Sequence, residues 1–280
     1  MKPEWLNKKI HLSTFDAMKK RLSPYKLHTV CEEAMCPNIS ECSARGTATF
    51  LIMGDVCTRG CTFCGVGRGT PEALDADEPS RVAAAAVDEL GLRYVVVTSV
   101  TRDDLPDGGA AHFARTVRAI KDKDDTVAVE LLIPDFDSLR DRVAAVVKSG
   151  ADVIAHNVET VERLYPAVGR EDYRYSVSMS VLETVKCIDK EAVTKSGLML
   201  GLGETEEEVL QTFEDLLDVK CDYLSLGQFL PPSQSHYQVK EYVTPETFGR
   251  YRDIALKMGF KSVKSGPYVR SSYLADEYGK

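Results

Sequence analysis

Apolar residues recur along the chain in two distinct patterns, one typical of strands and one typical of helices. Short apolar runs, typical of buried strands, lie at residues 49–53, 94–98, 126–132, 152–155, 197–200 and 223–226. Apolar residues recur at helical spacing near residues 80–91, 110–121, 137–149, 175–190, 205–218 and 245–258. Strands that alternate with helices predict an α/β fold, in which helices cover a parallel sheet. Six such units, fewer than the eight of a closed TIM barrel, predict a partial (βα)6 barrel.

The helix predicted at 205–218 has the best-marked beginning. Thr205 and Glu208 have the spacing of a capping box, in which the two residues cap each other's backbone N–H groups. Acidic residues fill the first turn, where the helix dipole favours negative charge. Val209, Phe213 and Leu216 recur on one face and predict burial of that face.

The chain divides into three predicted segments. Residues 1–48 have no regular rhythm and form a cysteine-bearing extension, residues 49–259 contain the six units, and residues 260–280 form a C-terminal segment. Functional residues of barrels gather at the C-terminal ends of the strands. The loops that follow the predicted strands are therefore the candidate site.

Composition and charge exclude several classes of protein. The 280 residues are 44% hydrophobic and 28% charged, as in globular proteins. No apolar run reaches the ~18 residues of a membrane span, and the N-terminus lacks the apolar region of a secretory signal. We therefore expect a cytoplasmic protein without membrane attachment. The net charge of −8 argues against a nucleic-acid partner.

The first 26 residues have the opposite charge. Their basic residues are Lys2, Lys8, Lys9, Lys19, Lys20, Arg21 and Lys26, against only Glu4 and Asp16. This basic arm is either a solvated surface or a docking surface for an acidic partner protein.

Cysteines supply the most specific chemistry. Cys57, Cys61 and Cys64 have CxxxCxxC spacing, and three thiolates can hold a cubic iron–sulfur cluster with one iron left open. Zinc fits this triplet poorly because structural zinc prefers four ligands. A set of disulfides is not expected in a large chain that lacks an export signal. Cys187 and Cys221 are expected to be buried small apolar residues.

A second triplet precedes the first. Cys31, Cys36 and Cys42 have CxxxxCxxxxxC spacing, for which zinc remains an alternative to iron.

The CxxxCxxC triplet, with Phe63 before its third cysteine, resembles the motif of radical S-adenosylmethionine (SAM) enzymes. The second triplet and the C-terminal run RSSY at 270–273 resemble those of lipoyl synthases. Further family-like stretches are TSVTRDDLPDGGA (98–110), HNVETVERLYPAVGR (156–170), KSGLMLGLGE (195–204), LSLGQFLPPS (224–233) and GFKSVKSGPYVRSSY (259–273). The resemblance covers nearly the whole chain.

This resemblance implies a [4Fe–4S] cluster on Cys57, Cys61 and Cys64, with SAM on the open iron. An electron from the cluster would cleave SAM to methionine and a 5′-deoxyadenosyl radical, which abstracts hydrogen from an unactivated carbon. The residues expected to contact SAM are Phe63, Thr98, Gly108, Gly109, Asn157, Glu159, Arg170, Gly201 and Gly203. An ordinary loop or a capped turn would explain several of these equally simply, and Arg102, Asp103 and Asp104 are compatible with a solvated loop.

The resemblance also implies a second, auxiliary [4Fe–4S] cluster on Cys31, Cys36 and Cys42. Ser271 would be its fourth ligand, with Ser272 as the fallback, and the C-terminal tail would close over the site. Serine is a harder ligand than cysteine, so it suits a cluster that gives up its sulfur during the reaction.

The implied reaction inserts two sulfur atoms at C6 and C8 of a protein-bound octanoyl-lysine and uses two SAM molecules. The implied partners are an octanoylated lipoyl domain or glycine-cleavage H protein, flavodoxin or ferredoxin as reductant, and an iron–sulfur cluster carrier. Alternatives are a methylthiotransferase and a non-catalytic two-cluster electron carrier. The chain departs from the family pattern at 168–171 and 230–239, which leaves the substrate contacts open.

Overall fold

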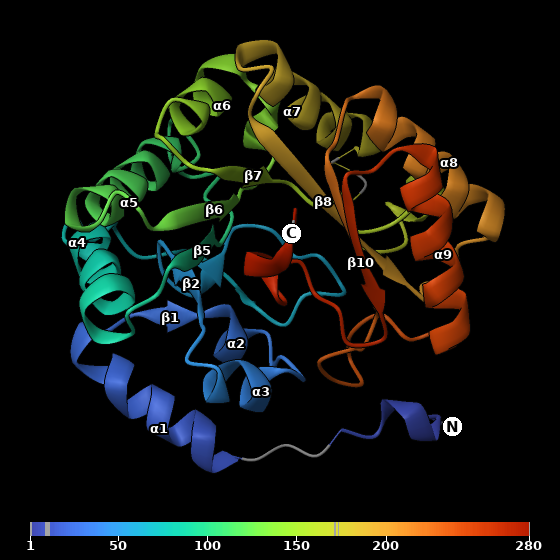
Figure 1. Ribbon diagram of the computed structural model, residues 1–280, viewed down its shortest axis with the longest axis horizontal. Helices are drawn as coiled ribbons and strands as arrows, with labels where there is room; N and C mark the ends of the chain where they lie inside the picture. The colour runs from blue at the N-terminus through green and yellow to red at the C-terminus, as the bar shows by residue number, and fades with distance from the viewer. Residues whose placement is uncertain (1, 9–11, 171, 173, 280) are drawn as a thin grey trace. The chain divides into compact units, whose positions relative to one another are not determined.

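The chain folds into two compact units (Figure 1). The computed structural model describes residues 2–8, 12–170, 172 and 174–279. The N-terminal unit comprises Lys9–Gly60 and Gly65–Ile154, and the C-terminal unit comprises Met1–Lys8, Cys61–Cys64 and Ala155–Lys280. In the part of the chain that is described, no helix has the length and apolar character that a membrane crossing requires.

The N-terminal unit is built on parallel strands. Its strands are β1 (His28–Thr29), β2 (Thr49–Ile52), β3 (Val56–Cys57), β4 (Gly67–Arg68), β5 (Tyr94–Ser99) and β6 (Ala128–Leu132), with β7 (Val153–Ala155) at the boundary. β2 pairs in parallel with β5, and β5 with β6, while the short β1 pairs antiparallel with β2. β-Branched residues fill β5, which suits a strand buried on both faces.

Helices of the N-terminal unit flank this sheet. They are α1 (Leu12–Leu22), α2 (Val30–Glu33), α3 (Ile39–Ala44), α4 (Glu78–Ala83), α5 (Ala110–Lys123) and α6 (Arg140–Val147). In Figure 1, α4, α5 and α6 run along the outer side of β5 and β6. α5 turns Phe113, Val117 and Ile120 inward, where they are fully buried.

The C-terminal unit repeats the same pattern. Its strands are β8 (Val193–Leu200), β9 (Tyr223–Gln228) and β10 (Ser262–Gly266), and its helices are α7 (Tyr175–Ile188), α8 (Glu206–Asp218) and α9 (Pro245–Met258). β9 pairs in parallel with β8 and with β10. Leu224, Leu226 and Phe213 lie in one apolar core between strands and helices.

The predicted α/β fold is confirmed, and all twelve predicted elements are present. The pattern missed β10, whose sequence SVKSG mixes polar and apolar residues, and it missed α1, α2 and α3 in the segment 1–48, which was expected to be irregular. It also placed one continuous helix at 80–91, where α4 passes into a π-helix at Ala84–Glu89. Cys221 is buried as expected, but Cys187 is exposed, so that expectation was wrong. It lies on the solvent side of α7, a position that helical spacing alone left ambiguous.

Candidate functional site

Cys57 ends the short strand β3, which lies in the connection that follows β2. Met53 there has a left-handed φ of 69°, and its backbone N–H donates to the buried carboxylate of Glu78 at 2.8 Å. The Cys57 Sγ accepts hydrogen bonds from two backbone N–H groups, those of Arg59 and Thr101, both at 3.4 Å. Donors of this kind stabilise a thiolate and tune the potential of any cluster that it holds.

Arg59 anchors this loop. Only 6% of its side chain is exposed. Its guanidinium donates to both oxygens of Asp103, at 2.8 and 2.9 Å, and to both oxygens of Asp135, one of them at 2.9 Å. Burial of the guanidinium charge is tolerated because both neighbouring loops supply a carboxylate that pairs with the planar group. No sequence pattern indicates this role, since Arg59, Asp103 and Asp135 are far apart in the chain.

The charged loop after β5 is solvated only in part, because Asp103 and Asp104 are exposed whereas Arg102 is buried. Arg102 is only 2% exposed. Its guanidinium forms a forked pair with Asp104, at 2.8 Å to each oxygen, and donates to the carbonyls of Met53 and Glu72. Asp103 is occupied by Arg59. Arg102 therefore fixes the loop and its neighbours from a buried position, while the two carboxylates remain open to water.

Gly108 and Gly109 make the tight turn before α5. Both have left-handed φ values, 63° and 89°. A Cβ on Gly109 would lie 2.3 Å from the sulfur of Met53, so the glycine lets this turn pack against the end of β2. Thr98, expected at the SAM site, donates its hydroxyl to the carbonyl of Leu132 at 2.8 Å. The SAM contacts of these residues stay predictions.

The auxiliary triplet folds into one compact corner of the N-terminal unit. The Cys36 N–H donates to the Cys31 carbonyl at 3.2 Å, and the Cys42 N–H donates to Asn38 at 2.9 Å, so successive turns bring the cysteines together. Burial, with smaller contributions from the neighbouring Cys36 and Cys42, raises the pKa of the Cys31 thiol to about 12. Neighbouring, partly buried thiols are suited to a metal, because a bound cation stabilises their thiolates.

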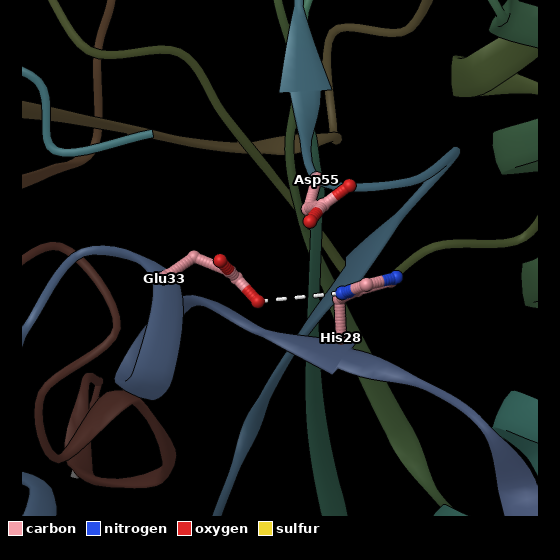
Figure 2. A group of neighbouring side chains, drawn as sticks. All are labelled: His28, Glu33 and Asp55. Atoms are coloured by element: carbon pink, nitrogen blue, oxygen red, sulfur yellow. Dashed lines mark hydrogen bonds and ion pairs between the residues drawn. The ribbon is translucent and has the colours of Figure 1, made fainter. Parts of the chain in front are cut away.

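A group of three polar side chains that the sequence did not single out lies in the N-terminal unit (Figure 2). Figure 2 shows His28 and Glu33 facing each other, at 3.3 Å between Nδ1 and Oε1, with Asp55 above them. The three could hold a metal ion, since their ligand atoms lie within 4.8 Å of one another. Asp55 is exposed and the imidazole already pairs with Glu33, so an ion pair is a sufficient explanation.

Cys61 and Cys64 belong to the C-terminal unit. They are joined by a turn, in which the Cys64 N–H donates to the Cys61 carbonyl at 3.1 Å. Backbone bonds of Thr62 with Val168 and Tyr237, at 3.0 and 2.9 Å, hold this turn between two loops. The turn also carries Phe63, whose ring packs against the apolar core of this unit. The aromatic residue of the motif thus anchors its cysteines.

The loop after β7 carries an unusual acid. Glu159 has a left-handed φ of 66°, fixed by backbone bonds to Gly197 at 3.0 Å and Met199 at 2.8 Å. Burial raises the pKa of Glu159, while the Arg170 guanidinium and a hydrogen bond from Asn157 lower it in part. Arg170 is 7% exposed, stacks over the Tyr165 ring, and has an Nε with no hydrogen-bond partner among the described residues. An acid at a strained φ, with a buried arginine nearby whose Nε lacks a partner, is typical of a ligand site.

Gly201 and Gly203 bend the loop after β8, with φ values of 93° and 113°. A Cβ on Gly201 would lie 2.3 Å from both the Gln228 amide and the Glu241 carbonyl, so this glycine is required by internal packing. The Glu204 carboxylate accepts the backbone N–H groups of residues 201–203, and burial raises its pKa. The approach of a ligand to these glycines stays a prediction.

The RSSY tail lies beside the loop after β7. The Ser271 hydroxyl donates to Asn157 Oδ1 at 3.1 Å. Gly227 allows the tail to approach β9, since a Cβ there would lie 2.1 Å from the Val269 carbonyl. Among the described residues, Ser272 makes no side-chain hydrogen bond that would distinguish it in this way. The two serines thus differ in their contacts, and the assignment of Ser271 as the iron ligand stays a prediction.

Residues 51–216 match the model of the Radical SAM superfamily. The chain is 54% identical over 276 residues to a lipoyl synthase of Caldicellulosiruptor bescii, covering 98% of this chain and 94% of that one. It is 56% identical over 278 residues to a lipoyl synthase of Geotalea uraniireducens, covering 99% and 97%. The chain belongs to the lipoyl synthase family.

Solved structures agree on the fold of this lipoyl synthase family member. The hydrogenase maturase HydG of Carboxydothermus hydrogenoformans has a TM-score of 0.59 at 14% identity, covering 90% of this chain and 70% of that one. Methylornithine synthase has a TM-score of 0.58 at 12% identity, covering 90% and 76%. At such low identity these likenesses show the fold alone.

Membership of the radical SAM superfamily implies a [4Fe–4S] cluster and SAM. The side chains present fit both groups. SAM ends in an amino acid with an ammonium and a carboxylate, and Glu159 and the unpartnered Arg170 Nε offer the opposite charges. The two N–H groups on Cys57 suit a thiolate that ligates iron.

Proposed function

We propose that this radical SAM enzyme inserts sulfur at C6 and C8 of an octanoyl group carried on a lysine of a protein. The observation that carries the proposal is the pairing of two separate three-cysteine motifs with an RSSY serine in one chain. Support comes from relatives named lipoyl synthase that match over nearly the full length. The octanoylated protein would be a lipoyl domain or a glycine-cleavage H protein. Flavodoxin or ferredoxin would supply electrons, and an iron–sulfur carrier would rebuild the auxiliary cluster.

When bound, the clusters and SAM supply the electron, the hydrogen-abstracting radical and the sulfur. The chain supplies position and charge. Cys57, Cys61 and Cys64 would hold the first cluster, and Arg59 keeps the Cys57 loop in place through Asp103 and Asp135. Cys31, Cys36 and Cys42 would hold the second cluster.

Charged side chains and close-packed glycine loops would together form the binding site for SAM. Asn157, Glu159 and Arg170 would bind the amino-acid end of SAM, because they combine a carboxylate and a guanidinium in an enclosed loop. Phe63, Thr98, Gly108, Gly109, Gly201 and Gly203 would complete its surroundings. Ser271 would be a replaceable oxygen ligand of the auxiliary cluster, since a hard oxygen is poorly matched to iron–sulfur iron.

The test uses the anaerobically reconstituted protein, an octanoyl-lysine peptide, SAM and dithionite. We expect a peptide product with two added sulfur atoms, detected by mass spectrometry, and about eight irons per chain, four for each cubane. Replacement of Cys31, Cys36 and Cys42 by Ala should leave about four irons and 5′-deoxyadenosine formation, but no sulfur insertion.

Three outcomes would contradict this proposal. A methylthio product would assign a different sulfur transfer, and absence of 5′-deoxyadenosine would indicate an electron carrier. About four irons in the unmodified protein would remove the second cluster. Glu33→Gln serves as the control for iron that binds adventitiously at His28, Glu33 and Asp55, because it removes a ligand there without touching a cysteine.

A further inference from the structure

A buried pair of a carboxyl group and an imidazole lies behind the strand that leads to Cys57. Glu78 begins α4 and His112 lies in the first turn of α5, and their side chains are 8% and 0% exposed. The imidazole Nε2 lies 2.7 Å from Glu78 Oε2, and the same oxygen accepts the backbone N–H of Met53 at 2.8 Å. All four residues belong to the N-terminal unit. Burial of polar groups costs free energy that these hydrogen bonds offset, so the carboxyl group is held in one place.

Arg115 decides where the imidazole proton lies. Its Nη2 lies 3.0 Å from His112 Nδ1, and a guanidinium can only donate. Nδ1 therefore accepts, so the ring carries its proton on Nε2. His112 thus donates to Glu78 and orients the oxygen that accepts from Met53.

Met53 is held from several sides in a conformation that it would not adopt alone. Its φ of 69° lies in the left-handed region, which is unfavourable for a residue with a Cβ. Glu78 accepts its N–H, and Arg102 donates to its carbonyl at 3.3 Å. Its sulfur packs against Gly109. Without the Glu78 contact, the backbone can relax and leave β2 in another direction.

The direction of the chain at Met53 decides where Cys57 lies. Only three residues separate the two, so a change at Met53 is not absorbed before the cysteine. The Cys57 Sγ accepts the backbone N–H of Thr101, on the loop after β5, at 3.4 Å. A hydrogen bond to a ligand sulfur withdraws negative charge from it and favours the reduced form of an iron–sulfur cluster.

We propose that Glu78 and His112 are positioning residues for the radical cluster, because through the backbone of Met53 they hold the Cys57 sulfur against the Thr101 N–H. The inference rests on the proposed function only in placing the first cluster on Cys57. Loss of either side chain lets Met53 leave its left-handed conformation and weakens the bond to sulfur. The cluster is then harder to reduce.

The experiment measures the reduced fraction of the first cluster at fixed applied potentials, by electron paramagnetic resonance. It uses the reconstituted full chain with Cys31, Cys36 and Cys42 replaced by Ala, so that one cluster is observed. We expect Glu78→Ala to lower the ratio of reduced to oxidised cluster about three- to tenfold. Glu78→Gln should leave the ratio within about twofold, because its amide oxygen can replace Oε2 although the carboxyl group is lost.

Substitutions of His112 give the same comparison from the other side of the pair. His112→Ala should lower the ratio as Glu78→Ala does. His112→Gln keeps an N–H donor in place of Nε2 and should stay within about twofold of the unmodified protein. This second pair of variants decides the question if Glu78→Ala does not fold.

Asp222→Ala is the matched control for lost stability. The Asp222 carboxylate is 5% exposed and accepts the backbone N–H of Thr194 at 2.8 Å, at the beginning of β8. Its loss should destabilise the protein but leave the ratio unchanged. An unchanged ratio in Glu78→Ala and His112→Ala would show that the buried pair is merely structural. Equal falls in Glu78→Ala and Glu78→Gln would assign the effect to charge, and either result overturns the proposal.

Hydrogen exchange of the cluster-free protein supplies a readout that needs no iron. The Met53 amide should exchange about tenfold faster in Glu78→Ala than in Glu78→Gln, because only the alanine removes its acceptor. Equal exchange rates in the two variants would contradict the role of the Glu78 oxygen. Sulfur insertion enters neither measurement, so failure of this proposal and failure of the proposed function are separate results.

Discussion

Single residues in this protein carry roles that depend on their burial. Arg59 differs from most arginines of the chain because its side chain is 6% exposed and is bound by two carboxylates. Arg163 makes a similar forked pair with Glu208, but 56% of its side chain is exposed. The same chemical pair therefore has a positioning role in one place and a weak surface role in the other.

Arg59→Ala should lower the free energy of unfolding by about 3–5 kcal/mol, because it leaves the buried Asp135 carboxylate without its partner. Arg163→Ala is the matched control and should cost less than about 1 kcal/mol, since water screens an exposed pair. Urea unfolding of the cluster-free proteins, followed by circular dichroism, measures both. Equal effects would show that Arg59 does not hold the Cys57 loop through buried charge.

At the scale of elements, two contacts fix how the site loops leave the strands. β2 ends at a left-handed Met53, whose sulfur fills the space above Gly109 at the beginning of α5. The local signals for these elements lie in the sequence, and the capping box of Thr205 and Glu208 at α8 is confirmed. The contact between β2 and α5 has no local signal, because it joins residues 56 positions apart.

Gly109→Ala should destabilise the protein by about 1–3 kcal/mol. The new Cβ would lie 2.3 Å from the Met53 sulfur, and the φ of 89° is strained for alanine. Gly249→Ala is the control within α9, where a Cβ meets no atom within 4 Å, and it should stabilise by about 0.5–1 kcal/mol. The free energy of urea unfolding gives both values. Stabilisation by alanine at both positions would refute the close packing of Gly109 on Met53.

At the scale of the whole molecule, charge is unevenly distributed. The net charge is −8, yet the first 26 residues are basic. Part of this basic arm is already engaged, since Lys19 pairs with Glu32, Arg21 pairs with Glu89, and Lys8 lies over the Tyr268 ring. Lys9 lies outside the described residues. Lys20 and Lys26 are exposed, so they are the better candidates for docking an acidic carrier protein.

Replacement of Lys20 and Lys26 by Gln should raise KM for an octanoylated carrier protein about two- to fivefold at low salt, without a change for a short octanoyl peptide. The effect should fade as salt shortens the range of the charge interaction to about 8 Å or less. Lys190→Gln with Lys257→Gln makes the same change in net charge elsewhere on the surface and should have no such effect. A rise in KM for both substrates would place the two lysines outside carrier docking.

Several properties of this protein were determined by its sequence alone. The alternation of strands and helices predicted the α/β fold. The spacing of apolar residues shows which face of each element is buried, and this spacing differs between strands and helices. Spacing placed three cysteines in one short segment and three in another, because the chain between them is too short to carry them far apart. The RSSY motif pointed to the C-terminal tail before its position was known.

The tertiary structure decided what joins these parts. Arg59 meets Asp135 across 76 residues, and Ser271 meets Asn157 across 114. It also showed that Arg102 is buried, although charged loop residues are usually solvated. Such contacts leave no local pattern in one sequence, because their partners are chosen by how strands and loops pack in three dimensions. The sequence therefore determined the elements and the cysteine chemistry, and the folded chain determined which side chains position them.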